Sequence, residues 1–250
     1  MVTPLEDLLN AITSIHSSTS TTAQRNNAYN TCESFKQTCE NLPLAGLQLS
    51  KTSNPIPVRH FGYQLLEHFV KFKWTEMGDD NKAEFKTVLI NHLGDDGTLK
   101  ILEEATLIKN IISSLLTEIL KRDWPQHWLE FFPTIKANLT GNNTAGELLL
   151  SSVSRLIEDI ELDNNLTHVR RADLLRSIGS CNENIIELLL AKLQEVLAFS
   201  QSEGFSFTKP SSLHKIGLAG LSVFSAAIPM TWFNVSSIMT KKSEVCTFLV

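Results

Sequence analysis

The residues most able to ligate a metal or act as nucleophiles are four cysteines and seven histidines, and their spacing predicts neither role. The cysteines contain no CxxC pair, the spacing typical of zinc sites and dithiol chemistry. The histidines form no HExxH sequence and no regular spacing with carboxylates. The residues weighed are Cys32, Cys39, Cys181, Cys246, His60, His68, His92 and His127. We therefore expect reduced cysteines, as in a cytosolic or nuclear protein, and no metal or other cofactor.

Sequence motifs for catalysis are absent. The chain has no glycine-rich phosphate loop, no GxSxG nucleophile elbow, no Cys-His signature and no clustered carboxylate motif. Scattered serine, histidine and aspartate residues form a triad only where a fold brings them together, and no motif predicts that here. The sequence therefore predicts a protein that is not an enzyme.

One polar stripe is suited to binding a partner through ion pairs and hydrogen bonds. Between residues 58 and 74, helical spacing places it in one narrow sector beside a wide apolar face. Two of its residues, Glu67 and Lys71, are spaced i,i+4, where opposite charges attract. The stripe consists of His60, Gln64, Glu67 and Lys71, joined by Asn110, Thr117 and Lys121 from a second helix. We interpret these residues either as a binding face or as a solvated surface.

Charge argues against a free-standing nucleic-acid binder. The formal net charge is −5, and residues 76–104 carry eight acidic residues against three lysines. Phosphate binding needs a concentrated positive surface. Acidic pairs at 79–80, 95–96 and 103–104 could steer a basic partner or could simply be solvated. Arg170, Arg171 and Arg176 could contact RNA phosphate, although a salt-bridged helix start is the favoured interpretation.

The elements that position these residues are predicted to be helices throughout. Apolar spacing places them at 4–15, 22–40, 43–50, 56–73, 80–93, 99–122, 125–139, 145–160, 166–199, 212–228 and 233–248. Pairing 22–40 with 43–50, 56–73 with 80–93, and 99–122 with 125–139 gives a period of about 40 residues, as in two-helix solenoid repeats. The sequence therefore predicts an all-α, HEAT-repeat solenoid of antiparallel helix pairs.

A tryptophan and proline cluster is predicted to be structural. Pro125 follows Asp123 and Trp124, an order that suits the first turn of a helix, where a missing amide costs nothing. The indoles of Trp124 and Trp128 are large enough to fill the space between neighbouring repeats. We therefore expect Trp124, Pro125 and Trp128 to form a packing knot.

Four stretches are more specific than helical periodicity and resemble the nuclear export receptors of the importin-β (karyopherin-β) superfamily. They are CESFKQTC at 32–39, VRHFGYQLLEHFVKFKW at 58–74, GTLKILEE at 97–104 and ILKRDWPQHW at 119–128. The resemblance is strong from about residue 23 to 135, weaker to about 200 and poor beyond. Since these receptors are several times longer, we expect the chain to be their N-terminal portion, either a fragment or a truncated product.

The resemblance implies a right-handed superhelix in which the second helix of each repeat lines the concave surface. It also implies that N-terminal repeats bind Ran-GTP, which makes the seven-residue stripe the expected Ran contact. The complete receptor would bind nucleoporins, shuttle between nucleus and cytoplasm, and carry protein or small structured double-stranded RNA, such as microRNA precursors and tRNA. An acidic stretch is compatible with a basic partner, since complementary charge speeds association.

The predicted organisation is a single HEAT-repeat array over 1–250. It comprises the family's N-terminal region at 23–135, further repeats at 136–200, a loop or insert at 201–212 and terminal helices at 213–250. Two alternatives remain open: a helical interaction scaffold without transport activity, and a membrane protein anchored by the uncharged segment 216–240. The polar content of that segment and Pro229 favour a buried, interrupted helix pair instead.

Overall fold

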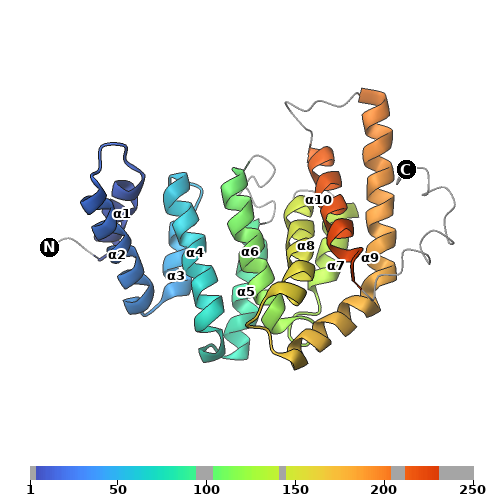
Figure 1. Cartoon of the computed structure of the whole chain (residues 1–250), viewed down its shortest axis with the longest axis horizontal. Helices are drawn as coiled ribbons and strands as arrows, with labels where there is room; N and C mark the ends of the chain where they lie inside the picture. The colour runs from blue at the N-terminus through green and yellow to red at the C-terminus, as the bar shows by residue number, and fades with distance from the viewer. Residues whose placement is uncertain (1–3, 94–103, 141–144, 204–211, 231–250) are drawn as a thin grey trace. The chain divides into compact units, whose positions relative to one another are not determined.

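The computed structural model describes residues 4–93, 104–140, 145–203 and 212–230 (Figure 1). Over these ranges the chain forms ten α-helices and one short 3-10 helix, with no strand. This result confirms the predicted all-α fold. The helices fall into two compact units, Met1–Glu118 and Ile119–Val250, and the boundary lies inside a helix. The extent of a single array over 1–250 stays a prediction.

Helices α1 to α5 and most of α6 form the first unit. Their bounds are α1 Pro4–His16, α2 Thr22–Thr38, α3 Leu42–Leu49, α4 Ile56–Phe72, the 3-10 turn η1 Trp74–Glu76, α5 Asp79–Leu93 and α6 Thr106–Asp123. Helix α2 starts with a capping box in which Thr21 and Gln24 satisfy each other's backbone amides. The rings of Phe69, Trp74 and Phe85 then form an aromatic cluster that joins α4, η1 and α5.

Helices α3 and α4 approach so closely that their contact requires glycine. A Cβ atom on Gly62 would lie 2.7 Å from the backbone nitrogen of Ser50 and 2.9 Å from the carbonyl oxygen of Gly46. These obstacles are backbone atoms and cannot rotate away. Gly62 therefore allows the two helices to approach at a distance that any larger residue would prevent.

The helix pairs begin one helix earlier than predicted. Helix α1 packs on α2 and α3 packs on α4, as Figure 1 shows for these neighbours. The packed pairs are therefore α1–α2 and α3–α4 instead of the predicted α2–α3 and α4–α5, although a ring contact also joins α4 to α5. The physical reason is that a period fixes the length of a repeat and leaves its starting point open, whereas the glycine contact joins α3 to α4. With this assignment α4 is the second helix of its pair.

The second unit is built around helix α8. It contains α7 Phe131–Thr140, α8 Gly146–Leu162, α9 His168–Glu203 and α10 Ser212–Ala227. Helix α10 packs mainly on α8 and also on α9, while α7 contacts both α8 and α9. The core-facing side of α8 is apolar and buried: Leu148, Leu149, Val153, Leu156, Ile157 and Ile160. This helix therefore contributes a continuous apolar face to the core of the unit.

The turn between α6 and α7 carries the predicted tryptophan cluster. Trp124 and Trp128 are 2% and 8% exposed, and their rings lie 5.0 Å from those of Phe132 and Phe131 respectively. Helix α7 starts at Phe131, so the predicted helix start at Pro125 was wrong. Residues 124–127 instead form a turn at the end of α6, in which the amide of His127 bonds the Asp123 carbonyl at 2.7 Å.

The apolar C-terminal region is only partly described. Helix α10 ends at Ala227, and the predicted helix 233–248 lies outside the described residues, as does most of the predicted insert at 201–212. Within the described part of the chain, no helix combines the length and the apolar character needed to cross a bilayer.

Candidate functional site

The polar residues predicted on α4 occupy the face of that helix that the fold leaves open. Nine residues of α4 are buried: Val58, Arg59, Phe61, Gly62, Tyr63, Leu65, Leu66, Phe69 and Val70. His60, Gln64 and Glu67 are half-buried and Lys71 is exposed. The amphipathic spacing that identified the stripe therefore also identified the surface of α4 correctly.

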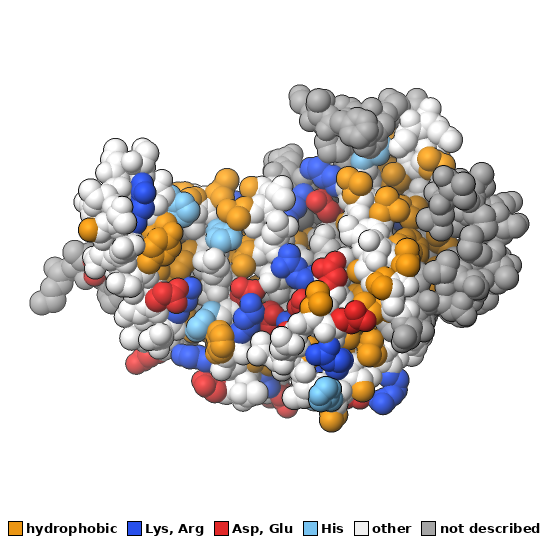
Figure 2. Space-filling view, in the orientation of Figure 1, with side chains coloured by type: hydrophobic (Ala, Val, Ile, Leu, Met, Phe, Trp, Pro, Cys, Tyr) orange, Lys and Arg blue, Asp and Glu red, His pale blue; other side chains and the backbone are white. Residues whose placement is uncertain are grey.

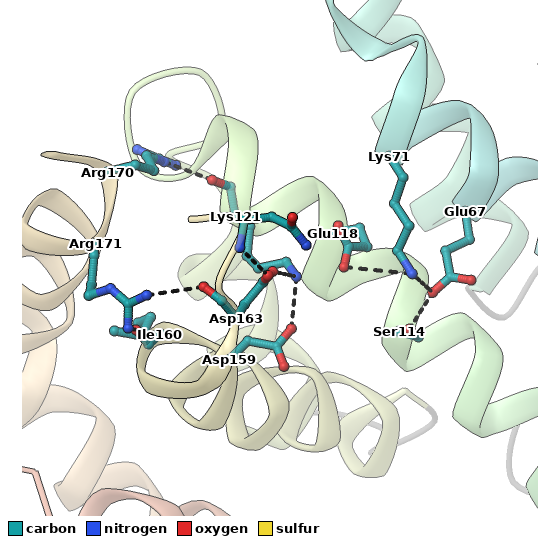
Figure 3. Close-up of polar contacts among 11 residues, drawn as sticks. Glu67, Lys71, Ser114, Glu118, Lys121, Asp159, Ile160, Asp163, Arg170 and Arg171 are labelled. Atoms are coloured by element: carbon teal, nitrogen blue, oxygen red, sulfur yellow. Dashed lines mark hydrogen bonds and ion pairs between the residues drawn. The ribbon is translucent and has the colours of Figure 1, made fainter. Parts of the chain in front are cut away.

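Contacts with α6 tie part of this face down. Ser114 Oγ donates a hydrogen bond to Glu67 Oε1 at 2.5 Å, and Lys71 Nζ lies 3.0 Å from the same oxygen (Figure 3). Lys71 Nζ also lies 3.9 Å from Glu118 Oε1, an atom of α6 within the first unit. We call Glu67, Lys71, Ser114 and Glu118 the α4–α6 seam. Its side chains range from 37% exposed at Lys71 to 9% at Glu118, so one end of the seam meets solvent.

The other predicted residues of the first unit differ in their access to a partner. Asn110 is exposed, whereas Thr117 is buried and donates its hydroxyl to the Ser113 carbonyl at 2.9 Å. Burial lowers the pKa of His60, the nearby His16 lowers it further, and Glu67 opposes both. His60 is therefore neutral at neutral pH and able both to donate and to accept a hydrogen bond.

Lys121 is not accessible to a partner. It is 6% exposed, and its Nζ lies 2.9 Å from Asp159 Oδ2 and 2.7 Å from Asp163 Oδ2, at the end of α8. A buried lysine held by two carboxylates cannot reach a partner without breaking both ion pairs. The physical reason is that, within the second unit, two carboxylates at the C-terminal end of α8 bind the Lys121 ammonium group.

The three arginines considered for RNA binding have separate environments. Arg170 donates from Nε to the Lys121 carbonyl at 2.7 Å, from Nη1 to Gln126 at 2.9 Å, and from Nη2 to two further carbonyls, those of Leu120 and Trp124. Arg171 donates to the carbonyls of Ile160, Glu161 and Asp163, the last two at 2.7 and 3.0 Å.

Arg176, by contrast, is largely solvent-exposed. Its side chain is 77% exposed and forms an i,i+3 ion pair with Asp173 at 3.0 Å. Arg176 thus forms an ion pair as predicted, but in the third turn of α9 and not at its start. Arg170 and Arg171, which are at the helix start, donate mainly to backbone carbonyls. We call Arg170, Arg171, Lys121 and Asp163 the arginine lock (Figure 3).

A buried polar cluster at the start of α4 was not predicted. The guanidinium of Arg59 pairs with the carboxylate of Glu104, with side chains 8% and 9% exposed. Tyr63 is fully buried beside them, and its burial raises the pKa of its hydroxyl, which also hydrogen-bonds Ser50. Neither interpretation given for Glu104, steering of a partner or simple solvation, holds, because its carboxylate pairs with Arg59 inside the unit. A basic residue at an otherwise apolar position of α4 was the available signal.

Charged side chains of both signs are interspersed on the face that Figure 2 shows. Lysine and arginine do not gather there into the continuous positive surface that phosphate binding needs. Of the acidic pairs noted in the sequence, Asp79 and Asp80 are exposed, whereas Asp95, Asp96 and Glu103 lie outside the described residues. Interspersed charge of this kind suits contact with another protein better than contact with a nucleic acid.

Two family models match the sequence. The model described as "Exportin 1-like protein" matches residues 105–248, and the "Importin-beta N-terminal domain" model matches residues 28–95. The first therefore covers more than half of the chain, and the second includes α4 and its open face.

Individual relatives agree with these matches. The chain is 36% identical to Exportin-5 of Mus musculus over 190 residues, which cover 76% of the chain and 16% of that protein. It is 32% identical to Exportin-5 of Homo sapiens over 247 residues, covering 98% of the chain and 20% of the relative. Protein EXPORTIN 1A of Arabidopsis thaliana is 25% identical over 175 residues. The chain thus spans a fifth or less of the length of the two Exportin-5 relatives and aligns with their N-terminal part.

Proposed function

Because the chain belongs to the exportin 1-like family, we propose that it acts within a nuclear export receptor and contacts Ran-GTP through the open face of α4. The observation that carries the proposal is that this face falls inside the importin-β N-terminal domain match, a Ran-binding type of domain. The corrected pairing supports the proposal, because α4 is the second helix of its pair. The resemblance to the superfamily implies that second helices line the concave surface.

The contact surface consists of the accessible members of the predicted stripe. These are His60, Gln64, Glu67, Lys71 and Asn110. Thr117 and Lys121 are left out because both are buried and bonded within their own unit. Lys71 is the charge most available to a partner, since it has the most exposed side chain of the α4–α6 seam.

The wider activity follows from the family and rests on the same proposal. Members of the family are transport receptors and not enzymes. As part of such a receptor, the chain would shuttle between nucleus and cytoplasm and meet nucleoporins. The cargo we propose for the complete receptor is small structured double-stranded RNA or protein. Since Arg170 and Arg171 donate to carbonyls of their own unit, any RNA contact would fall elsewhere.

A retention experiment tests the proposal. The immobilised chain is incubated with Ran loaded with GTP or with GDP, and we expect selective retention of the GTP form. The variant Lys71→Glu should weaken retention at low salt, whereas Lys51→Glu, the same charge change at an exposed residue outside the stripe, should not. Equal retention of both nucleotide forms, or of neither, would contradict the proposal and favour a helical scaffold without transport activity.

A further inference from the structure

Two arginines stand at the start of α9, where a positive charge is unfavourable. Thr167 caps this helix by accepting a hydrogen bond from the Arg170 amide at 3.2 Å, so Arg170 and Arg171 lie in its first turns. The amino end of a helix carries a partial positive charge that favours acidic residues, yet the first turn of α9 contains none. The placement of both arginines therefore needs another explanation.

The ends of α6 and α8 supply that explanation. The last four carbonyls of a helix have no partner within it and carry partial negative charge. Arg170 donates to Leu120 and Lys121 near the end of α6, and Arg171 donates to Ile160 and Glu161 near the end of α8. Helix α8 has no basic residue in its own last turn. The charges that are misplaced on α9 are thus well placed for two other helices.

The donors reach beyond the helix ends into the turns that follow. Arg170 also bonds the Trp124 carbonyl and the Gln126 side chain, both in the turn that carries the tryptophan cluster. Arg171 also bonds the Asp163 carbonyl, while the carboxylate of the same residue accepts from Lys121. Burial lowers the pKa of Arg170, with Asp173 and Asp123 opposing, and an arginine so affected still remains charged at neutral pH.

We propose that Arg170 and Arg171, from the first turns of α9, act as C-terminal caps for two other helices of the same chain, α6 and α8. They thereby hold these helix ends to α9 as a conformational lock, and they do not form a ligand site. Each guanidinium presents several donors in a fixed plane and can satisfy carbonyls that a single ammonium group cannot span. The lock closes three segments of the second unit together, and its loss would loosen both helix ends without removing apolar contacts. This inference does not depend on Ran binding.

Amide hydrogen exchange on the full chain tests each arginine at its own helix end. In Arg170→Ala, the amides of Trp124 and His127, which bond the carbonyls of Leu120 and Asp123, should exchange at least about tenfold faster. In Arg171→Ala, the same increase should appear at the amides of Asp163 and Leu166. The matched control Arg176→Ala removes an exposed arginine of the same helix and should change neither set.

Two further measurements keep the test decisive. If an alanine variant fails to fold, Arg170→Lys and Arg171→Lys keep the charge and should give smaller increases at the same amides. A short RNA hairpin used as a probe should bind the arginine variants as it binds the unaltered chain. Unchanged exchange at the named amides, or reduced hairpin binding by a folded variant, would overturn the inference.

Discussion

The α4–α6 seam and the arginine lock contain the same kinds of charged side chain, but the seam is partly exposed and the lock is buried. In the seam, Glu67 and Lys71 pair across 3.0 Å while Lys71 stays 37% exposed. In the lock, Lys121 is 6% exposed and bonded to two aspartates, and the neighbouring arginines bond uncharged carbonyls. Salt screens an exposed ion pair, and its side chains exchange partners easily. A buried donor that is bonded to carbonyls is not screened in this way and keeps its partners.

Residue type alone therefore does not distinguish a binding face from an internal structural contact. Lys71 and Lys121 both lie on the polar side of an amphipathic helix, and both pair with acidic residues. What separates them is the neighbour: in its own unit, α8 covers Lys121, while Lys71 retains contact with solvent. Substitutions in each region should therefore differ in their cost to folding.

The largest effect should come from the aromatic cores, where the two units are alike. Trp124→Ala should cost about 3–5 kcal/mol in the free energy of unfolding, and Trp74→Ala in the first unit should cost a similar amount, because both indoles are buried. Urea denaturation followed by circular dichroism measures both. An unchanged midpoint for Trp124→Ala would show that the indole does not contribute to packing and would revive a binding role.

The next largest difference should appear when one lysine is removed from each region and the losses in the free energy of unfolding are compared. Lys121→Met leaves Asp159 and Asp163 without the lysine that binds both, and should lower the free energy of unfolding by about 2–3 kcal/mol. This loss is smaller than that expected for a fully buried ion pair, because Asp159 is 30% exposed. Lys71→Met should cost less than about 0.5 kcal/mol. Equal losses in urea denaturation would contradict the distinction between lock and seam.

Acid should weaken the lock through Asp163. Burial alone would raise the pKa of Asp163, but hydrogen bonds from Lys121 and from the Asn165 amide outweigh it and lower the pKa below its usual value of 3.8. The stability this carboxylate provides is therefore complete above its unfolded pKa and is lost as pH falls through the lower, folded pKa. Asp163→Asn should flatten this acid-dependent loss of melting temperature. A variant whose acid profile matches that of the unaltered chain would rule the carboxylate out.

The smallest effect should be the salt dependence of the seam. A double-mutant cycle on Glu67 and Lys71 should give a coupling of about 0.3–0.5 kcal/mol at low ionic strength, falling as salt is added. The exchange rates of Trp124 and His127, which the lock protects, should respond little to the same salt. A coupling that stays constant up to high salt would place the seam among buried contacts.

Helical spacing predicted most of the fold. Ten of the predicted segments correspond to observed α-helices, and the open face of α4 was located from its apolar periodicity alone. The pairing of helices was not predicted, because a repeat of about 40 residues has no intrinsic starting point. The starting point depends on the glycine contact between α3 and α4, and a contact between separate helices leaves no periodic trace in sequence.

The polar contacts were the least predictable part. Arg59 pairs with Glu104 across 45 positions, and Lys121 reaches Asp163 across 42, so no local spacing links them. The arginines of α9 carried a usable signal, since two positive charges at a helix start violate the usual preference. That signal indicates that such residues serve another element, although it does not say which one.

The separation in sequence between Arg170 and its acceptors determines the order in which donor and acceptors are synthesised. Arg170 comes 46 to 50 positions after the carbonyls of Trp124 and Leu120. At roughly 5–20 residues per second of synthesis, the end of α6 waits about 3–10 seconds for its cap. The residues of α8 are synthesised within that interval. The carbonyls at the end of α6 therefore receive their bonds from Arg170 only after all of α8 has been made.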